Sequence, residues 1–286
     1  MAVDSGKVLV REIIPTRAER GGERVLKDAL ELTANLIRKA SAIQSEILGI
    51  GVGVAELVDL SGNVTSGQTI RWNGMPIQES FGRLAPAVVE SDVRAAALAE
   101  SRFGAGKPFE LFVYITVGTG ISYSLVQEGR PFPGSRGNAL ILSSSPLTTT
   151  CTACGAVLRP VLEEFASGPA LVQRYNLEGS NSFACGEEVL SAVERGDSVG
   201  ARVVKSAGEA LGVSVAFLVN VLDPQAVIVG GGLGLAGGLY WSSFVASTRD
   251  HIWAESSRGL PILTATLGTD AGLIGAAATV VQRSAG

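Results

Sequence analysis

The stretch LFVYITVGTGISYSLVQ (111–127) decides the fold class. Residues 111–117 are β-branched, aromatic or aliphatic and predict a buried strand, and 121–127 predict a second strand that returns after Gly118-Thr119-Gly120. Glycine lets a backbone approach a phosphate, and free N–H groups at such a turn bind anions. The same glycines also make ordinary turns, and the residues by themselves favour that simpler interpretation.

Short apolar runs alternate with helical patterns on both sides of this stretch. Strands are expected at 8–14, 48–54, 87–90, 226–229 and 261–267, and helices at 25–47, 92–100, 163–175, 186–195, 198–222 and 272–281. Strands that alternate with helices in this way are typical of an α/β protein.

Composition narrows the class of protein further. The 286 residues are 46% hydrophobic and 17% charged, with a net charge of −4, so a sizeable core is expected and a basic nucleic-acid surface is not. The apolar run 226–248 carries six glycines and predicts turns rather than a membrane helix. Three cysteines and no apolar leader indicate a protein of the reducing cytoplasm, with no membrane partner.

Three further features could carry chemistry. Gly134-Ser135-Arg136-Gly137 and Gly230-Gly231-Gly232 are glycine turns, the latter directly after a strand, and neither is a P-loop or Rossmann pattern. Asp92 lies where a strand ends and a helix begins, so it is either a general base or a helix N-cap, and Ser91 is the other candidate for that cap. The residues alone favour the cap.

Taken in order, these segments resemble the ROK family of sugar kinases and sugar-responsive repressors. The matching segments cover nearly the whole chain and are VESD (89–92), AAALAE (95–100), FGA (103–105), TVGTGI (116–121), LEEFASG (162–168), Asp223-Pro224, VIVGGG (227–232) and LGTDAGLIGAA (267–277). The resemblance implies a two-domain, actin-like (ribonuclease-H-like) ATPase fold. The expected smaller domain is 1–108 with the returning helix 269–286, and the larger is 109–268.

The resemblance also implies roles for individual residues. Asp92 would take the proton of a sugar hydroxyl that attacks the γ-phosphoryl group of ATP, with Mg²⁺ as the second cofactor. Ser91, Asn73 and Glu163 would bind the sugar, although Glu163 could also simply stabilise a helix N-terminus. Gly118, Thr119 and Gly120 would hold phosphates, and Gly230, Gly231 and Gly232 would border the adenosine. Trp72 and Met75 are expected either to stack on a ligand or to pack in the core.

The sequence departs from the family at four places. An Asp-x-Gly-Gly-Thr phosphate loop is expected before residue 1, so either the start lies further upstream or half of the nucleotide grip is missing. Two asparagines of the family fall on Ser91 and Arg94, and a sugar-binding glutamate and a zinc-binding histidine fall on Ile141 and Ser144. Cys151 and Cys154 remain of a zinc cluster whose other ligands are absent, so no metal site is expected. His251, the one histidine, has a surface or interface role as its simplest interpretation.

Two functions from different classes remain open at this point. The first is an ATP-dependent kinase for a sugar or sugar-like cyclitol, and the second is a non-catalytic sugar-sensing or regulatory protein of the same fold. A DNA-binding repressor would need a helix-turn-helix before residue 1 and a basic patch. A cytoplasmic homodimer that binds neither nucleic acid nor membrane is expected in either case.

Overall fold

The computed structural model describes residues 1, 5–43, 46–150, 154–179 and 182–284. The chain forms two compact units, one of residues 1–108, 126–139 and 269–286, and one of residues 109–125 and 140–268. These units share the boundaries at 108 and 268 with the division expected from the sequence, and they differ from it over 126–139. The assignment of these parts of the chain as a smaller and a larger domain stays a prediction.

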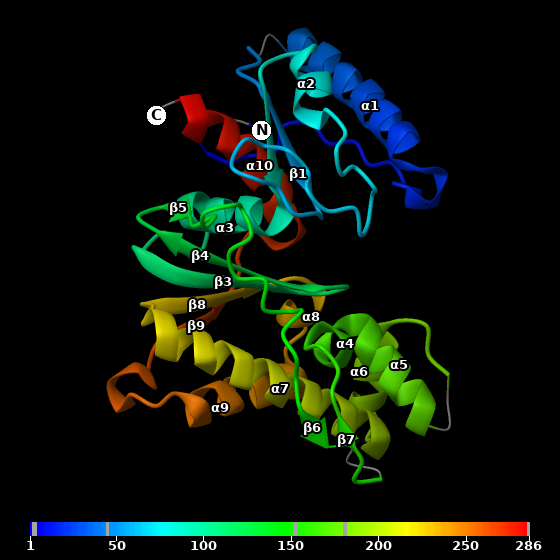
Figure 1. Cartoon of the computed structure of the whole chain (residues 1–286), viewed down its shortest axis with the longest axis vertical. Coiled ribbons are helices and arrows are strands. Elements are labelled where there is room, and N and C mark those ends of the chain that lie inside the picture. Colours follow the sequence, from blue (N-terminus) through cyan, green and yellow to red (C-terminus); the bar gives the residue numbers. More distant parts are fainter. Residues whose placement is uncertain (2–4, 44–45, 151–153, 180–181, 285–286) are drawn as a thin grey trace. The chain divides into compact units, whose positions relative to one another are not determined.

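The first unit is built around a pair of parallel strands. Its elements are η1 (Ala18–Arg20), α1 (Gly22–Ala42), β1 (Ile50–Val54), α2 (Ile77–Gly82), β2 (Ala87–Ser91), α3 (Asp92–Phe103), β5 (Arg130–Pro131), η3 (Gly268–Asp270, which straddles the boundary) and α10 (Ala271–Ser284). β1 and β2 pair in register from Ile50 with Ala87 to Val54 with Ser91. In Figure 1 the elements from α1 to α3 run from blue to blue-green, β5 is green and α10 is red.

Small residues let α10 approach its neighbours closely. A Cβ added to Gly275 would lie 1.7 Å from the Ala95 carbonyl oxygen of α3, and one added to Gly51 of β1 would lie 1.6 Å from the Ala276 carbonyl oxygen. Only glycine is compatible with such backbone contacts. The glycine- and alanine-rich composition of 272–281 therefore serves helix packing.

Two sequence expectations fail in this unit. Residues 8–14 form no strand, because a strand needs a ladder partner and none of the described residues pairs with this segment. The apolar stripe that begins at Val25 predicts a helix to Ile47, but α1 ends at Ala42 and Ile43 and Ile47 are exposed. Propensity and periodicity indicate local preference, and packing decides where an element ends.

The second unit holds most of a five-stranded sheet. Its elements are β3 (Leu111–Val117), β4 (Ile121–Gln127), β6 (Thr149–Thr150), β7 (Val157–Leu158), α4 (Glu163–Ala166), α5 (Gly168–Glu178), α6 (Gly186–Glu194), α7 (Ser198–Leu222), β8 (Ala226–Gly230), α8 (Gly232–Leu235), α9 (Gly238–His251), η2 (Glu255–Ser257) and β9 (Ile262–Thr264). The strand order is β5-β4-β3-β8-β9, in which β8 runs parallel to both β3 and β9. The last two residues of β4 and the edge strand β5 belong to the first unit.

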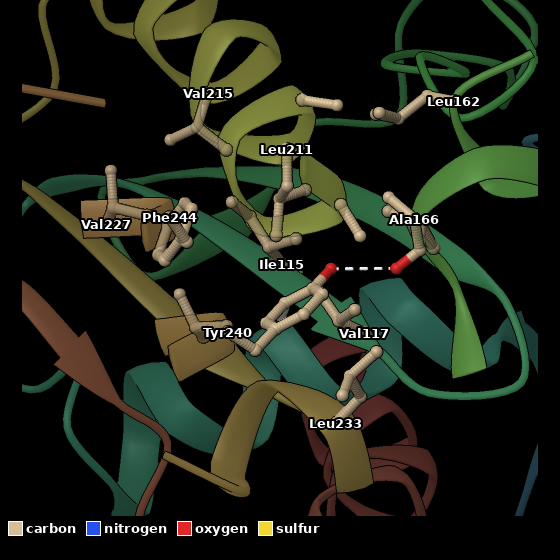
Figure 2. Close-up of a cluster of buried hydrophobic side chains, with 14 of the residues drawn as sticks. Ile115, Val117, Leu162, Ala166, Leu211, Val215, Val227, Leu233, Tyr240 and Phe244 are labelled. Atoms are coloured by element: carbon tan, nitrogen blue, oxygen red, sulfur yellow. Dashed lines mark hydrogen bonds between the residues drawn. The ribbon is translucent and has the colours of Figure 1, made fainter. Parts of the chain in front are cut away.

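The core of this unit lies between the sheet and the helices α7 and α9. Ile115, Val227, Leu211 and Phe244 meet there, as Figure 2 shows, and all four side chains are buried. Glycines again bring helices together, since a Cβ on Gly208 of α7 would lie 2.5 Å from the Tyr240 carbonyl oxygen of α9.

Among the described residues, α7 is the one helix long and apolar enough to span a membrane by length and composition, and 56% of its most apolar window is buried in the protein. Its apolar residues are thus used in the core of the second unit. The glycine-rich run 226–248 folds as β8, α8 and most of α9 with turns between them, as its glycines predict.

Candidate functional site

In the first unit, two acidic residues follow the carboxyl ends of neighbouring strands. β1 ends at Val54 and is followed by Glu56, and β2 ends at Ser91 and is followed by Asp92. Parallel strands present their carboxyl ends at one edge of a sheet, where α/β proteins usually bind ligands. Val54 is in register with Ser91, so Glu56 and Asp92 both follow this edge of the strand pair.

Ser91, and not Asp92, caps helix α3. The buried Ser91 hydroxyl accepts a hydrogen bond from the Arg94 N–H at 3.5 Å, and its backbone is extended, as an N-cap requires. Asp92 is the first residue of the helix, and its carboxylate accepts the Val93 N–H at 2.7 Å while the side chain stays exposed. The preference for Asp92 as the cap was therefore wrong.

The Asp92 carboxyl has a raised pKa. Desolvation by the surrounding protein is the largest cause, the Glu56 carboxylate adds to it, and the hydrogen bond from Val93 works against both. A carboxylate whose pKa is shifted toward neutrality accepts a proton more readily. The Asp92 side chain is thus exposed at the carboxyl end of β2, and its carboxyl has a raised pKa.

Glu56 is a residue that the sequence reasoning missed. Its side chain is 6% exposed, and its carboxylate accepts hydrogen bonds from the Ser66 hydroxyl and from the N–H groups of Gln68, Thr69 and Ile70. Burial alone would raise the Glu56 pKa, but these hydrogen bonds outweigh burial and lower it. Its position just beyond the apolar run 48–54 was the available signal.

Asn73 lies on the loop that Glu56 anchors. Its side chain is exposed and packs beside Gly67, where an added Cβ would lie 2.5 Å from the Asn73 Oδ1 atom. The neighbouring Trp72 is buried and donates its Nε1–H to the Gly22 carbonyl at 2.9 Å. Trp72 is thus a core residue, and Met75 packs partly buried against the same cluster.

In the second unit, Gly118, Thr119 and Gly120 form the turn between β3 and β4. The Gly118 N–H donates to the Gly120 carbonyl at 2.9 Å, and the Gly118 carbonyl accepts the Gly168 N–H at 2.8 Å. The side chain of Thr119 is exposed. One hydrogen bond inside the turn and one from the first residue of α5 therefore fix its backbone, and the Thr119 side chain stays accessible.

Glu163, the first residue of α4, lies against the same turn. Its Oε2 atom accepts the Ile121 N–H at 2.8 Å, and a Cβ added to Gly120 would lie 2.7 Å from that oxygen. The structure thus gives one carboxylate oxygen of Glu163 a contact that positions the turn, and the sugar contact that the family resemblance implies stays a prediction.

The two glycine turns expected at the nucleotide come together in this unit. Gly230 is in register with Thr116 of β3, so Gly231 follows β8 next to the end of β3. Gly231 has a φ of +82°, and a Cβ there would lie 2.4 Å from the Val117 carbonyl oxygen. A Cβ at Gly232 would meet open space. These strand ends thus combine close backbone packing with an accessible edge, which suits a phosphate-bearing ligand.

The third glycine turn has a structural use. Gly137 has a φ of +83°, and a Cβ there would lie 2.1 Å from the Val58 carbonyl oxygen. The guanidinium of Arg94 donates to the carbonyls of both residues. Gly137, the buried residue of the turn, is therefore packed against the backbone at Val58, in keeping with the simpler interpretation of these glycines.

No cluster of three His, Cys, Asp or Glu side chains that could hold a metal ion is present among the described residues. Cys151 lies outside them, whereas Cys154 and Cys185 are free, exposed thiols. The Nδ1 atom of His251 lies 2.8 Å from the Ser247 carbonyl of its own helix.

Comparison with known proteins identifies the family. The ROK family model matches residues 2–283. The ROK hexokinase of Thermus thermophilus is 30% identical in its crystal structure and superposes with a TM-score of 0.81 over 99% of this chain and 94% of that chain. A ROK glucokinase from Streptomyces griseus, solved with glucose and AMPPNP, is 28% identical and has a TM-score of 0.79 over 97% of this chain and 93% of that one.

A regulator is also among the relatives. The xylose repressor of Caldicellulosiruptor bescii is 24% identical over 294 residues, which cover 97% of this chain and 73% of the repressor. The solved structures share the two-part, actin-like α/β ATPase architecture, which is the fold of this protein. With a family model that spans almost every residue and relatives of both functional kinds, the chain belongs to the ROK family.

Proposed function

We propose that this protein is an ATP-dependent kinase that phosphorylates a hydroxyl group of a sugar or a sugar-like cyclitol. The observation that carries the proposal is Asp92, an exposed carboxylate with a raised pKa at the carboxyl end of a parallel strand pair. The relatives support the reaction class, since two solved ROK relatives are a hexokinase and a glucokinase.

The first unit supplies the substrate side of the proposed reaction. Asp92 accepts the proton of the attacking hydroxyl, and the low pKa of Glu56 keeps a second negative charge near it. Asn73 lies exposed on the loop held by Glu56 and is assigned a hydrogen bond to the sugar. Ser91 caps α3, so its part is to fix the direction of Asp92, in addition to the sugar contact expected from the sequence.

The second unit supplies the nucleotide side. The exposed Thr119 hydroxyl and the backbone of the turn Gly118–Gly120 are assigned to the phosphates of ATP, and the open edge at Gly230–Gly232 is assigned to the adenosine. ATP, with Mg²⁺, supplies the phosphoryl group when bound. One carboxylate oxygen of Glu163 accepts the Ile121 N–H and fixes the turn, and the other oxygen is assigned to a substrate contact.

The test is coupled ADP release by the purified chain across a panel of hexoses, amino sugars and cyclitols. Asp92→Asn is expected to reduce turnover by about 10²- to 10⁴-fold, the usual contribution of a positioned base. Asp28→Asn is the matched control, because Asp28 is a partly exposed residue of the same unit that pairs with Arg20. Equal rates for the two variants would overturn the assignment of Asp92.

The second candidate is a sugar-binding regulator without turnover. A repressor is among the relatives, and one oxygen of Glu163 is occupied by the Ile121 N–H. A sugar that raises the melting temperature without ADP release would establish this second function. The kinase proposal requires both binding and release.

We further propose a cytoplasmic homodimer, formed through an apolar stripe on the second unit. Val213, Phe217 and Val221 follow one another at helical spacing on α7, and Trp253 joins them because its N–H donates to Asn220 of that helix at 2.9 Å. Their exposed fractions run from 42% to 86%. Residues 210–222 carry no charge, so two copies can meet across this stripe without repulsion.

The area of the stripe fits a second copy of the chain. The four side chains expose on the order of 500 Å² per copy, so a symmetric pair buries roughly the 1,000 Å² that a specific interface needs. Light scattering is expected to give twice the monomer mass, and Phe217→Glu should give the monomer mass. Leu177→Glu is the control, because Leu177 is an exposed leucine of α5 and does not belong to the stripe. A monomeric wild-type protein would refute this proposal.

A further inference from the structure

The side chain of Arg94 is buried two residues beyond Asp92, and every part of its guanidinium is used. Arg94 is 7% exposed. Its Nε atom donates to Glu90 Oε1 at 2.6 Å, Nη1 donates to the Gly137 carbonyl at 2.6 Å, and Nη2 donates to the Val58 carbonyl at 2.7 Å. A buried cation is costly unless it is paired and hydrogen-bonded, so this arrangement requires all three partners.

The three partners come from three separate segments of the first unit. Glu90 belongs to the end of β2, Val58 follows β1, and Gly137 belongs to the turn at 134–137. The last two segments touch directly, since a Cβ on Gly137 would lie 2.1 Å from the Val58 oxygen and 2.9 Å from the Asp59 Cα atom. Arg94 thus closes a junction between two backbones that pack without any side chain between them.

This junction lies at the base of the candidate substrate loop. Val58 is two residues beyond Glu56, and Glu56 holds the backbone of residues 68–70 through three N–H groups. That loop leads to Asn73. Movement at Val58 would therefore displace Glu56 and Asn73 relative to Asp92.

We propose that Arg94 is a positioning residue that fixes the loop carrying Glu56 and Asn73 relative to Asp92, and that it thereby maintains the geometry in which the sugar binds. The inference rests on the proposed function for its substrate, but the mechanical part concerns the first unit alone. A guanidinium is required because its planar fork of five N–H donors reaches two carbonyls and a carboxylate together. A lysine at position 94 retains the charge and can satisfy Glu90, but it cannot bridge the same three groups.

The first test separates sugar binding from nucleotide binding. Arg94→Lys is expected to raise the KM for the sugar by about tenfold or more, because small displacements of a positioned substrate are costly. The KM for ATP should stay within about twofold of the wild-type value, because the variant weakens only the binding of the sugar. Gly137→Ala should reproduce this pattern with Arg94 intact, because its Cβ separates the two backbones.

Gly129→Ala is the matched control for Gly137→Ala. Gly129 lies in the same unit with a φ of +72°, but its added Cβ would meet only the Ser101 hydroxyl at 3.6 Å. It carries the same left-handed backbone penalty without affecting the junction. Unchanged sugar KM in both Arg94→Lys and Gly137→Ala would overturn the proposal, and so would an equal loss in the control.

Hydrogen exchange distinguishes this inference from the proposed kinase activity. In Arg94→Lys, amides of residues 56–70 are expected to exchange faster than in the wild type, whereas amides of β3 keep their protection. If the wild type shows no turnover, faster exchange in the variant still supports the positioning role. Unchanged exchange at 56–70 refutes that role, whatever the activity of the protein.

Discussion

Replacing Glu56 with glutamine tests the loop anchor at the candidate site. The carboxylate accepts four hydrogen bonds, two at each oxygen, from the Ser66 hydroxyl and the N–H groups of Gln68, Thr69 and Ile70. A glutamine NH₂ group in place of Oε2 can donate to the Ser66 hydroxyl, which turns to accept, but the Gln68 N–H then faces a second donor. Losing one bond to a buried charged acceptor is expected to lower the free energy of unfolding by about 2 kcal/mol. For a unit of this size the melting temperature should fall by about 5–10 °C.

The assay is thermal unfolding at pH 7, followed by circular dichroism, with Glu79→Gln as the control. Glu79 is exposed and pairs with Arg83 one helical turn away at 2.9 Å, an interaction worth at most about 1 kcal/mol. The Glu56 variant should unfold several degrees below the control. Equal melting temperatures would refute the reasoning, because the four hydrogen bonds would then add nothing over hydration by water.

The pH dependence of this effect has a definite sign. The Glu56 pKa is lowered in the folded protein, so its stabilisation is present above the unfolded-state value of 4.5 and is lost as the pH falls through the folded-state pKa. The difference between wild type and variant should therefore shrink in acid. The variant also removes a charge that raises the Asp92 pKa, so the acidic limb of any turnover should move to lower pH. A limb that stays in place would show that desolvation alone sets the Asp92 pKa.

Three further outcomes follow from named contacts. Tyr240→Phe removes a buried hydrogen bond of 2.8 Å to the Ala166 carbonyl (Figure 2), and urea unfolding should show a loss of about 1–3 kcal/mol without a change in secondary structure. Gly231→Ala should cost about 2 kcal/mol or more, whereas Gly237→Ala, at a φ of +70° in open space, should cost less, and equal values would contradict the close approach of backbones at Gly231. Thr119→Val should raise the KM for ATP and leave the KM for the sugar unchanged, as measured by initial-rate kinetics with each substrate varied in turn. A rise in the KM for the sugar alone would contradict the assignment of Thr119 to the phosphates.

The order of elements was readable from the sequence. The strands at 111–117 and 226–230, the helix at 198–222 and the turn Gly118–Gly120 occur where periodicity and glycine place them. These features depend on local chemistry: β-branched runs favour strands, apolar residues three and four apart favour a helix, and glycine permits a positive φ. The order of the motifs along the chain was sufficient to identify the family, because this comparison does not depend on which residues lie close together in the folded protein.

Contacts between distant segments could not be read in this way. Residues 8–14 have the composition of a strand, but they lack a partner among the described residues. Ser91 and Asp92 are equally good caps by composition, and only the backbone at the end of β2 decides that Ser91 takes the role and leaves Asp92 exposed.

Glu56 and Arg94 show most clearly what the tertiary structure decided. Each is a charged residue, a type that is usually exposed, and nothing in the neighbouring sequence marks either as buried. In the folded protein, Glu56 accepts hydrogen bonds from the N–H groups of residues 68–70, and Arg94 donates hydrogen bonds to the carbonyls of residues 58 and 137. The sequence determined which chemical groups are available and in what order, whereas the fold decided which of them meet. Buried charges are retained only where segments far apart in the chain bring enough hydrogen-bonding partners to one point.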